Sequence, residues 1–169
     1  MKFVAILCLS LFVATQAVPR FTRASELDVP SNVQNRSISI KGQFLCGTKP
    51  FDNVKIRIYR DYQKDKADDL AQLVSSKKAF AGMFQLDGNT ARFPPTQTEF
   101  RPYVTVHHNC GLDEKTTANQ GFKRWHFIIP EEYVTVGLRP IKKYDLGIIN
   151  LQVLYPGEAH DKKFNMLDQ

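Results

Sequence analysis

The sequence predicts an all-β protein, an antiparallel sandwich or barrel that forms one domain. Several short segments alternate apolar and polar residues with a period of two, which is typical of strands with one buried face. Turn residues separate these segments, and no long amphipathic helix is evident between them. Of the 169 residues, 43% are hydrophobic and 24% charged, a composition that supports a packed core and excludes a disordered polyelectrolyte.

Residues 1–17 are predicted to be a cleaved secretory signal peptide. Lys2 precedes an apolar block from Phe3 to Ala14, and small residues occupy the two positions that signal peptidase reads before a cut after Ala17. The block is shorter than the roughly 20 residues that span a bilayer, and it lacks the polar positions of an amphipathic buried helix. We therefore expect a soluble, extracellular mature protein without a transmembrane segment.

Residues 18–36 have no sustained period and contain two prolines, so they are expected to form a flexible N-terminal extension. Within them begins Asn35-Arg36-Ser37, an N-glycosylation sequon whose middle residue is not proline. Asn35 is therefore a candidate glycosylation site just before the first predicted strand.

The chain has three cysteines, and the predicted cleavage leaves two of them in the mature protein. Cys8 leaves with the signal peptide, so Cys46 and Cys110 remain as an even pair in a compartment that permits disulfides. A bridge between them would contribute on the order of 4 kcal/mol by restricting the unfolded chain. Two separate buried thiols are the alternative.

The first predicted strand runs from Ser37 to Cys46. Its alternation places Ile38, Ile40 and Phe44 on one face, and Gly42 indicates a bulge or a close backbone approach. The later segments that alternate, or that read as strands by composition, are 54–59, 70–76, 83–86, 103–110, 123–129 and 144–153, of which 70–76 could also be one helical turn.

Turns and loops are expected between these strands. The predicted connections are a turn at 47–53, a charged loop at Asp61–Asp69, a turn at Asp87-Gly88-Asn89, an extended Pro-rich segment at 93–102 and a polar loop at 111–121. The sandwich is expected to occupy residues 37–160, and residues 161–169 are expected to be a loose C-terminal tail.

No pattern of catalytic or metal-ligating residues stands out. His107 and His108 are adjacent in a predicted strand, so their side chains should point to opposite faces, and His126 has no partner at a ligand spacing. Ordinary strand histidines are favoured over a functional pair. The chain lacks a serine nucleophile elbow and a Gly-rich phosphate loop, and the Asp61–Asp69 loop lacks the spacing of a calcium-binding EF-hand. We therefore predict no catalytic residue, no metal and no cofactor.

Basic residues occur as doublets, and the net charge is +6. If the doublets gathered on one face they could bind an anionic lipid headgroup or a sulfated glycan, whereas dispersed doublets would be ordinary solvated positions. Nucleic acid is not an expected partner in an extracellular compartment. The doublets are Lys77-Lys78, Lys123-Arg124, Lys142-Lys143 and Lys162-Lys163.

Seven blocks of sequence between Ser37 and Asp161 occur in the order and at the spacing of a known family. They are GQFLCGTKP (42–50), NVKIRIY (53–59), GMFQLDG (82–88), PYVTVHHNC (102–110), IPEEYVT (129–135), YDLGIINL (144–151) and PGE (156–158). The chain resembles the nematode transthyretin-like family of secreted proteins. The resemblance implies a transthyretin-like (prealbumin-like) antiparallel Greek-key β-sandwich, with Cys46 and Cys110 as the family's common cysteine pair.

The chain departs from the family pattern in two respects. The positions of a second family cysteine pair hold Asn119-Gln120-Gly121 and His160-Asp161-Lys162, so no second bridge is expected, and Arg101 stands where aspartate is usual.

The resemblance implies a secreted binding protein whose partner is an unknown cell-surface receptor or an anionic lipid. It suggests a bridging role, in which a secreted protein recognises phosphatidylserine on dying cells and presents them to an engulfment receptor. A carrier of small hydrophobic ligands, for which an oligomer is possible, is the alternative. A hydroxyisourate hydrolase is disfavoured, because the chain lacks the C-terminal Tyr-Arg-Gly-Ser of those enzymes and offers no histidine in its first strand.

Overall fold

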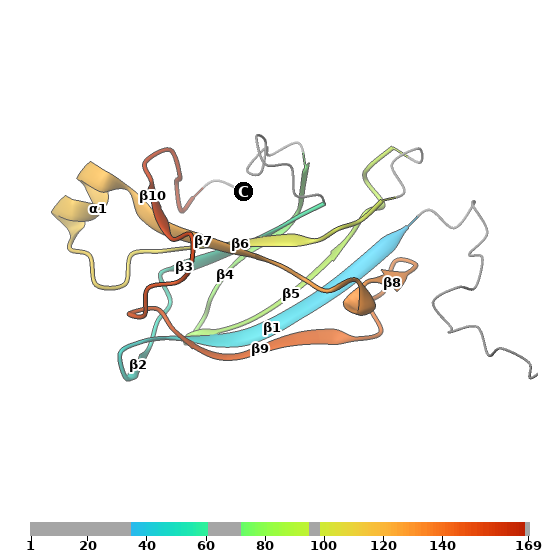
Figure 1. Cartoon of the computed structure of the whole chain (residues 1–169), viewed down its shortest axis with the longest axis horizontal. Coiled ribbons are helices and arrows are strands. Elements are labelled where there is room, and N and C mark those ends of the chain that lie inside the picture. The colour runs from blue at the N-terminus through green and yellow to red at the C-terminus, as the bar shows by residue number, and fades with distance from the viewer. Residues whose placement is uncertain (1–34, 61–71, 95–98, 168–169) are drawn as a thin grey trace, which may run out of the picture. The chain divides into compact units, whose positions relative to one another are not determined.

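The computed structural model arranges the strands in two sheets that face each other (Figure 1). It describes residues 35–60, 72–94 and 99–167, all of which belong to one unit, Ser31–Gln169. The predicted signal peptide, residues 18–34 of the predicted extension and the Asp61–Asp69 loop lie outside the described residues.

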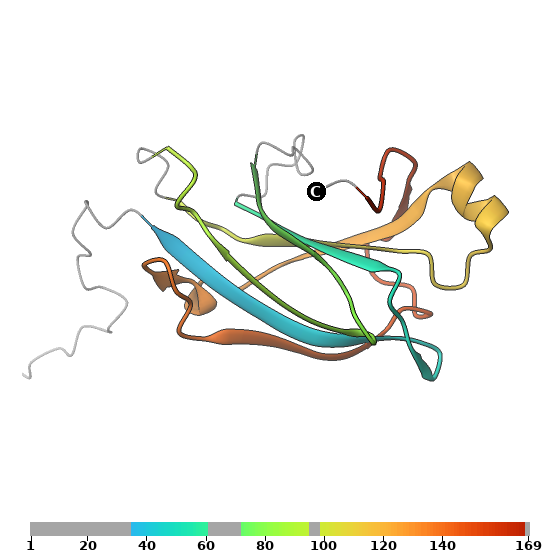
Figure 2. The same ribbon diagram turned by 180° about the vertical axis from the view of Figure 1, so that it is seen from behind.

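The long strand β1 (Arg36–Cys46) is the centre of the first sheet, with β5 (Met83–Asn89) antiparallel on one side and β9 (Lys143–Asn150) parallel on the other. Two short strands, β2 (Lys49–Pro50) and β8 (Thr135–Val136), pair with the ends of β1. Figure 2 shows β1, in blue, between β5 and β9 from behind.

The second sheet contains five strands whose neighbours are all antiparallel. Their order is β10 (Ala159–Asp161), β7 (Phe122–Ile128), β6 (Tyr103–His108), β3 (Val54–Tyr59) and β4 (Leu73–Lys78). The predicted all-β sandwich is therefore confirmed. Among the described strands, only β1 and β9 pair in parallel.

The core lies between the sheets and contains the apolar side chains that the alternation predicted. Phe44 of β1 stacks on Phe84 of β5, with ring centroids 4.9 Å apart. Fully burying one such side chain contributes about 1.5–3 kcal/mol. Other buried members are Ile38, Ile40, Val54, Ile56, Ile58, Val104, Val106, Trp125 and Leu151.

Gly42 was predicted to mark a bulge or a close backbone approach, and the close approach is observed there, whereas the extra residue of the bulge lies on β9, where Leu146 and Gly147 face Gly42 alone. The register between β1 and β9 shifts between Lys41 and Gln43. A Cβ added at Gly42 would lie 3.0 Å from Phe84 Cε1 and 3.2 Å from the carbonyl oxygen of Gly147. A side chain at this position would therefore push the strand away from both neighbours.

The turn predicted at Asp87-Gly88-Asn89 is wrong, because these residues continue β5 and pair with β1. Gly88 is needed here for packing, since a Cβ would lie 2.7 Å from Val74 Cγ1 on β4. The turn follows instead at Thr90, whose carbonyl oxygen accepts a hydrogen bond from the Phe93 N–H.

The polar loop predicted at 111–121 is also wrong, because it contains the helix α1 (Glu114–Gln120). Asp113 caps this helix: its side chain accepts from the Thr116 N–H at 2.6 Å, and Gly121 ends the helix with a φ of 87°. None of its residues is buried, so it has no apolar period. A short 3₁₀ helix, η3 (Glu131–Tyr133), follows β7.

The loose C-terminal tail is not observed between Asp161 and Leu167. Asp161 ends β10 opposite Phe122, and the side chain of Phe164 is buried with 9% exposure. We call residues 159–167 the C-terminal segment. Its first three residues are the edge strand β10 of the second sheet, and beyond them Phe164 and Met166 contact the outward side chains of His107 and Lys55.

The predicted disulfide is present. Cys46 at the end of β1 is bonded to Cys110, which follows β6, with 5.7 Å between the Cα atoms. The alternative of two separate thiols is therefore wrong. Because β1 and β6 belong to different sheets, the bridge joins the two layers of the sandwich at one end.

Candidate functional site

The outer face of the first sheet, which points away from the second sheet, carries rows of side chains across three strands. Directly opposite residues face the same side of a sheet. Lys41 of β1 lies between Gln85 of β5 and Asp145 of β9. The next outward position, Gln43, lies between Met83 and Ile148, and Ser39 lies between Asp87 and Lys143. The face therefore changes from polar to apolar along β1.

The polar part of this face is rich in lysine. Lys41 Nζ lies 2.8 Å from Asp145 Oδ2, and both side chains are about half exposed. The hydrogen bond from Lys41 is the main reason that the pKa of Asp145 is below its usual value. Lys143 Nζ donates to Gln85 Oε1 at 3.4 Å, so two ammonium groups lie along this part of the sheet.

The apolar part carries large side chains that remain in solvent. Met83 is 58% exposed and Ile148 is 67% exposed. Phe80 is 81% exposed and belongs to the tight turn between β4 and β5, in which Phe80 and Met83 pair. Clustered apolar exposure of this kind marks an interaction site more often than scattered single residues do.

A groove of about 560 Å³ connects the two parts, a size within the range of small-molecule sites. Its wall combines side chains of β1, β5 and β9 with two residues that precede β5. We call this hollow the groove. Its lining residues are Lys41, Gly42, Gln43, Lys77, Phe80, Met83, Phe84, Gln85, Asp145, Gly147 and Ile148.

A basic loop lies at one end of the same sheet. We give this name to residues 137–142, between β8 and β9, in which Leu138 is 53% exposed and Ile141 is 84% exposed. Arg139 and Lys142 are exposed beside them. The loop is held in place by hydrogen bonds from the Gly137 N–H to the Asn35 carbonyl oxygen and from the Ile141 N–H to Thr135 Oγ1.

Asn35, the predicted glycosylation site, is half-buried and directly precedes β1. Because its carbonyl oxygen accepts from Gly137, the sequon lies next to the basic loop. Glycosylation of Asn35 stays a prediction.

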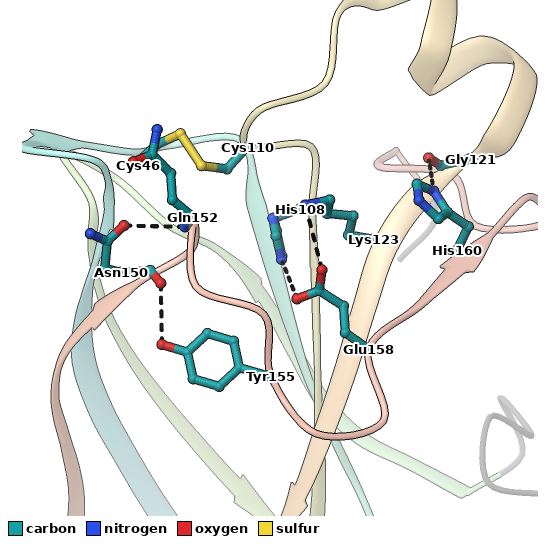
Figure 3. Close-up of polar contacts among 10 residues, drawn as sticks. All are labelled: Cys46, His108, Cys110, Gly121, Lys123, Asn150, Gln152, Tyr155, Glu158 and His160. Atoms are coloured by element: carbon teal, nitrogen blue, oxygen red, sulfur yellow. Dashed lines mark hydrogen bonds and ion pairs between the residues drawn. A yellow bond between two sulfur atoms is a disulfide. The ribbon is translucent and has the colours of Figure 1, made fainter.

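His108 points into the sandwich, toward the buried carboxylate of Glu158 (Figure 3). The nearest atoms, His108 Nε2 and Glu158 Oε2, are 3.9 Å apart, which is too long for a hydrogen bond. Burial lowers the pKa of His108 to about 4, and the nearby Lys123 adds to this effect. His108 is therefore neutral at pH 7, and the charge of Glu158 is balanced by Lys123 Nζ at 3.5 Å.

His107 points to the opposite side, as predicted from its position in a strand. Its ring stacks on Phe164 with centroids 3.8 Å apart, and its Nε2 lies 3.3 Å from Asp161 Oδ2. Burial lowers the pKa of His107 to about 4, although Asp161 opposes the shift. The two histidines therefore serve separate faces and form no functional pair with each other.

Within the described ranges, no three His, Cys, Asp or Glu side chains lie close enough to hold a metal ion. In the same residues, no helix is long and apolar enough to cross a membrane.

The basic doublets are divided between the two sheets. Lys77 lines the groove and Lys142 belongs to the basic loop, whereas Lys123 is engaged with Glu158 between the sheets. Arg124 is also on β7, and Lys162-Lys163 follows β10. The doublets therefore do not form one continuous basic surface.

Comparison of the sequence with known proteins identifies the family of the chain. A sequence model of the Transthyretin-like family matches residues 41–130, which include β1 from Lys41 onward and the strands up to β7. The chain belongs to the Transthyretin-like family.

Transthyretin-like proteins of Caenorhabditis elegans are similar over most of the chain. Transthyretin-like protein 46 is 27% identical over 80% of this chain and 70% of its own length. Transthyretin-like protein 33 is 30% identical over 76% of this chain and 83% of its own length. Transthyretin-like protein 5 is 28% identical over 95% of this chain and 98% of its own length.

A weaker likeness relates 68% of the chain to 16% of a 9R-lipoxygenase structure from Cyanothece, with 18% identity and a TM-score of 0.36. A score this low does not establish a shared fold.

Sequence reasoning missed the groove and the partners of His108. The outward position of Met83 could have been inferred, since it precedes the inward Phe84 in an alternating segment. The contact between Glu158 and Lys123 could not, because the two residues are far apart in the chain and follow no common period.

Proposed function

We propose that this protein is secreted and attaches to anionic lipid at a cell surface, where it can present that surface to a receptor. The predicted signal peptide supports secretion, and membership of the Transthyretin-like family agrees with it. The basic loop is the observation that carries the lipid proposal.

The loop combines the two features that hold a protein at a membrane surface. Leu138 and Ile141 present apolar side chains that can enter the boundary between headgroups and acyl chains. Arg139, Lys142 and the adjacent Lys143 are exposed cations, each of which contributes about 1 kcal/mol near an anionic leaflet. Apolar residues flanked by cations therefore favour an anionic membrane over a neutral one.

Sedimentation with liposomes tests this proposal. We expect the mature protein to bind vesicles that contain phosphatidylserine, to bind neutral phosphatidylcholine vesicles at least tenfold more weakly, and to be released by salt. Equal binding to both vesicles, or none above background to any acidic lipid, would remove the lipid proposal.

Two variants and their matched controls localise the contact. Arg139→Glu with Lys142→Glu should abolish binding to anionic vesicles, whereas Lys162→Glu with Lys163→Glu, the same charge change after β10, should leave it unchanged. Leu138→Ser with Ile141→Ser should weaken binding, and Val153→Ser with Leu154→Ser should not, although those residues are 55% and 78% exposed.

A carrier of small hydrophobic ligands is a second candidate function, and the groove is the observation that favours it. A ligand that binds only the folded state stabilises it, so the melting temperature rises as the ligand concentration increases. This function is excluded if hydrophobic ligands cause no such rise and sedimentation shows a monomer, which cannot form a channel between subunits.

A hydrolytic function has less support. His107 and His108 are buried and neutral at pH 7, and they face opposite sides of β6. We expect no turnover of hydroxyisourate by the purified protein, and measurable turnover would contradict this assignment.

A further inference from the structure

We propose that the groove binds one long-chain fatty acid, with the carboxylate at Lys41 and Lys77 and the hydrocarbon chain along Phe80, Met83 and Ile148. This inference rests on the second candidate function and names its ligand. It does not depend on membrane attachment, because the groove and the basic loop share no residue.

Charge in and beside the groove favours an anion. Two lysines, Lys41 and Lys77, line the groove with one carboxylate, that of Asp145, and Lys143 lies beside it with its ammonium at Gln85. Among the residues that the structure describes, Lys77 makes no hydrogen bond or ion pair, so its ammonium is available. Lys41 has three N–H donors and uses one for Asp145, so it can also donate to a bound carboxylate.

The order of the rows separates the head of the ligand from its chain. Lys41 and Gln43 are consecutive outward positions of β1, so the charged row and the apolar row are about 7 Å apart. A molecule with an anionic end and an unbranched apolar end matches this order. A compact polar anion would leave Met83 and Ile148 in water, and a neutral hydrocarbon would make no use of the ammonium of Lys77.

The bulge in β9 opposite Gly42 shapes the space for the hydrocarbon chain. Gly42 and Gly147 both line the groove and have no side chains, and Gly147 directly precedes the outward Ile148, so the middle of the groove has a floor of backbone at these two glycines. A flexible chain can lie over this floor between the side chains of Met83 and Ile148. Because the groove is open on one side, each added methylene is partly buried and should strengthen binding by about two- to fourfold.

Calorimetry with defined amphiphiles tests the proposal on the full mature chain. The probes are decanoate, dodecanoate and tetradecanoate, each below its critical micelle concentration, with dodecanol and dodecylamine as uncharged and cationic controls. We expect affinity to rise with chain length, and dodecanoate to bind at least tenfold more tightly than either control. Equal affinity for dodecanoate and dodecanol would overturn the role of the lysines.

Neighbouring residues provide matched variants. Lys77→Glu should weaken dodecanoate binding at least tenfold, whereas Lys78→Glu, the next residue of β4 and not part of the groove, should not. Ile148→Ser should weaken it severalfold, whereas Ile128→Ser should not, because Ile128 is 57% exposed on the other sheet. Because all four residues are exposed, the variants should fold, and urea unfolding checks this.

The outcomes separate this inference from the membrane proposal. Loss of vesicle binding in the basic-loop variants with intact dodecanoate binding would leave the groove assignment standing. Absence of dodecanoate binding to the wild type would overturn the inference whether or not vesicles bind. If Met83→Ser with Ile148→Ser converted a dimer to a monomer in sedimentation, the groove would be a contact between copies of the chain, and the inference would also fail.

Discussion

The outer faces of the two sheets differ in solvent exposure, and the difference is the opposite of what the polarity of their residues suggests. The second sheet directs Lys55, Arg57 and His107 outward, yet these side chains are only 8%, 6% and 1% exposed. The first sheet directs Met83 and Ile148 outward, and both are more than half exposed. The more strongly charged face is covered, whereas the part of the other face that carries Met83 and Ile148 is open, although Ser37 and Ser39 farther along β1 are buried.

The C-terminal segment contributes to this difference. The guanidinium of Arg57 lies 4.8 Å from the centre of the Phe164 ring, and Lys55 Nζ donates to the carbonyl oxygen of Met166 at 3.1 Å. Cation–π and hydrogen-bond contacts of this kind partly offset the loss of water around the cations. Exposure of a sheet face is therefore decided by which other parts of the chain pack on it as well as by its own polarity.

The largest effect should come from the bridge that holds both faces in place. Replacing both cysteines, Cys46→Ala with Cys110→Ala, should lower the free energy of unfolding by about 4 kcal/mol, because the closed loop spans 64 positions. Urea unfolding measures the loss, and reduced wild type should match the variant. An unchanged urea midpoint would show that the sheets need no covalent link.

Acid should also lower the free energy of unfolding, because the second sheet contains two buried histidines. The pKa of His107 is about 4 in the folded protein and about 6.5 when unfolded, so the unfolded state binds more protons between these values. The stabilising contribution is complete above pH 6.5 and is lost as the pH falls to 4, by about 3 kcal/mol for this residue. His108, which faces the core, should add a similar loss.

The variant His107→Phe keeps the ring and removes the titration, so stability should depend less on pH than in the wild type when measured by urea unfolding between pH 7 and 4. A pH dependence equal to that of the wild type would contradict this assignment.

Removal of one ring should open the covered face. Phe164→Ala should lower the free energy of unfolding by about 3 kcal/mol, since Phe164 is 9% exposed and contacts His107, Arg57 and Phe122. The pKa of His107 should rise toward its ordinary value, which nuclear magnetic resonance can follow. Leu167→Ala is the control, because Leu167 is 86% exposed and should change neither quantity.

The smallest effects should come from the open face. Lys41→Gln breaks only a half-exposed ion pair, and Met83→Ser replaces a side chain that is mostly in water, so neither should shift the urea midpoint measurably. A clear loss of stability in either variant would show that the groove contributes to the fold and is not reserved for a ligand.

Much of the sandwich could be predicted because alternation follows from burial on one side of a strand. The segments at β1, β3, β6 and β7 each show it, and Gly42 indicated the close backbone approach. Helix α1 was missed because it buries none of its side chains, and β10 because three residues are too few to show a period. Asp87-Gly88-Asn89 has the composition of a turn, but packing against Val74 determined its conformation.

The groove could be predicted only in part. Alternation places Met83 on the outer side of β5, but sequence does not reveal that nothing among the described residues covers it. The position of Ile148 depends on the bulge in β9 opposite Gly42 and on the parallel pairing of β9 with β1, which joins residues about a hundred positions apart. The cover on His107 depends in the same way on Phe164, a residue in the predicted tail.

The parallel pair of β1 and β9 also has a consequence for the order of folding. Ser39 must meet Lys143, and such distant pairings are slow because a long loop must close before contacts form. During synthesis β1 emerges early and β9 late, so one edge of β1 stays without its partner until nearly all of the chain is available. In that interval the strand at the centre of the first sheet has an unpaired edge, which can pair with other chains and lead to aggregation.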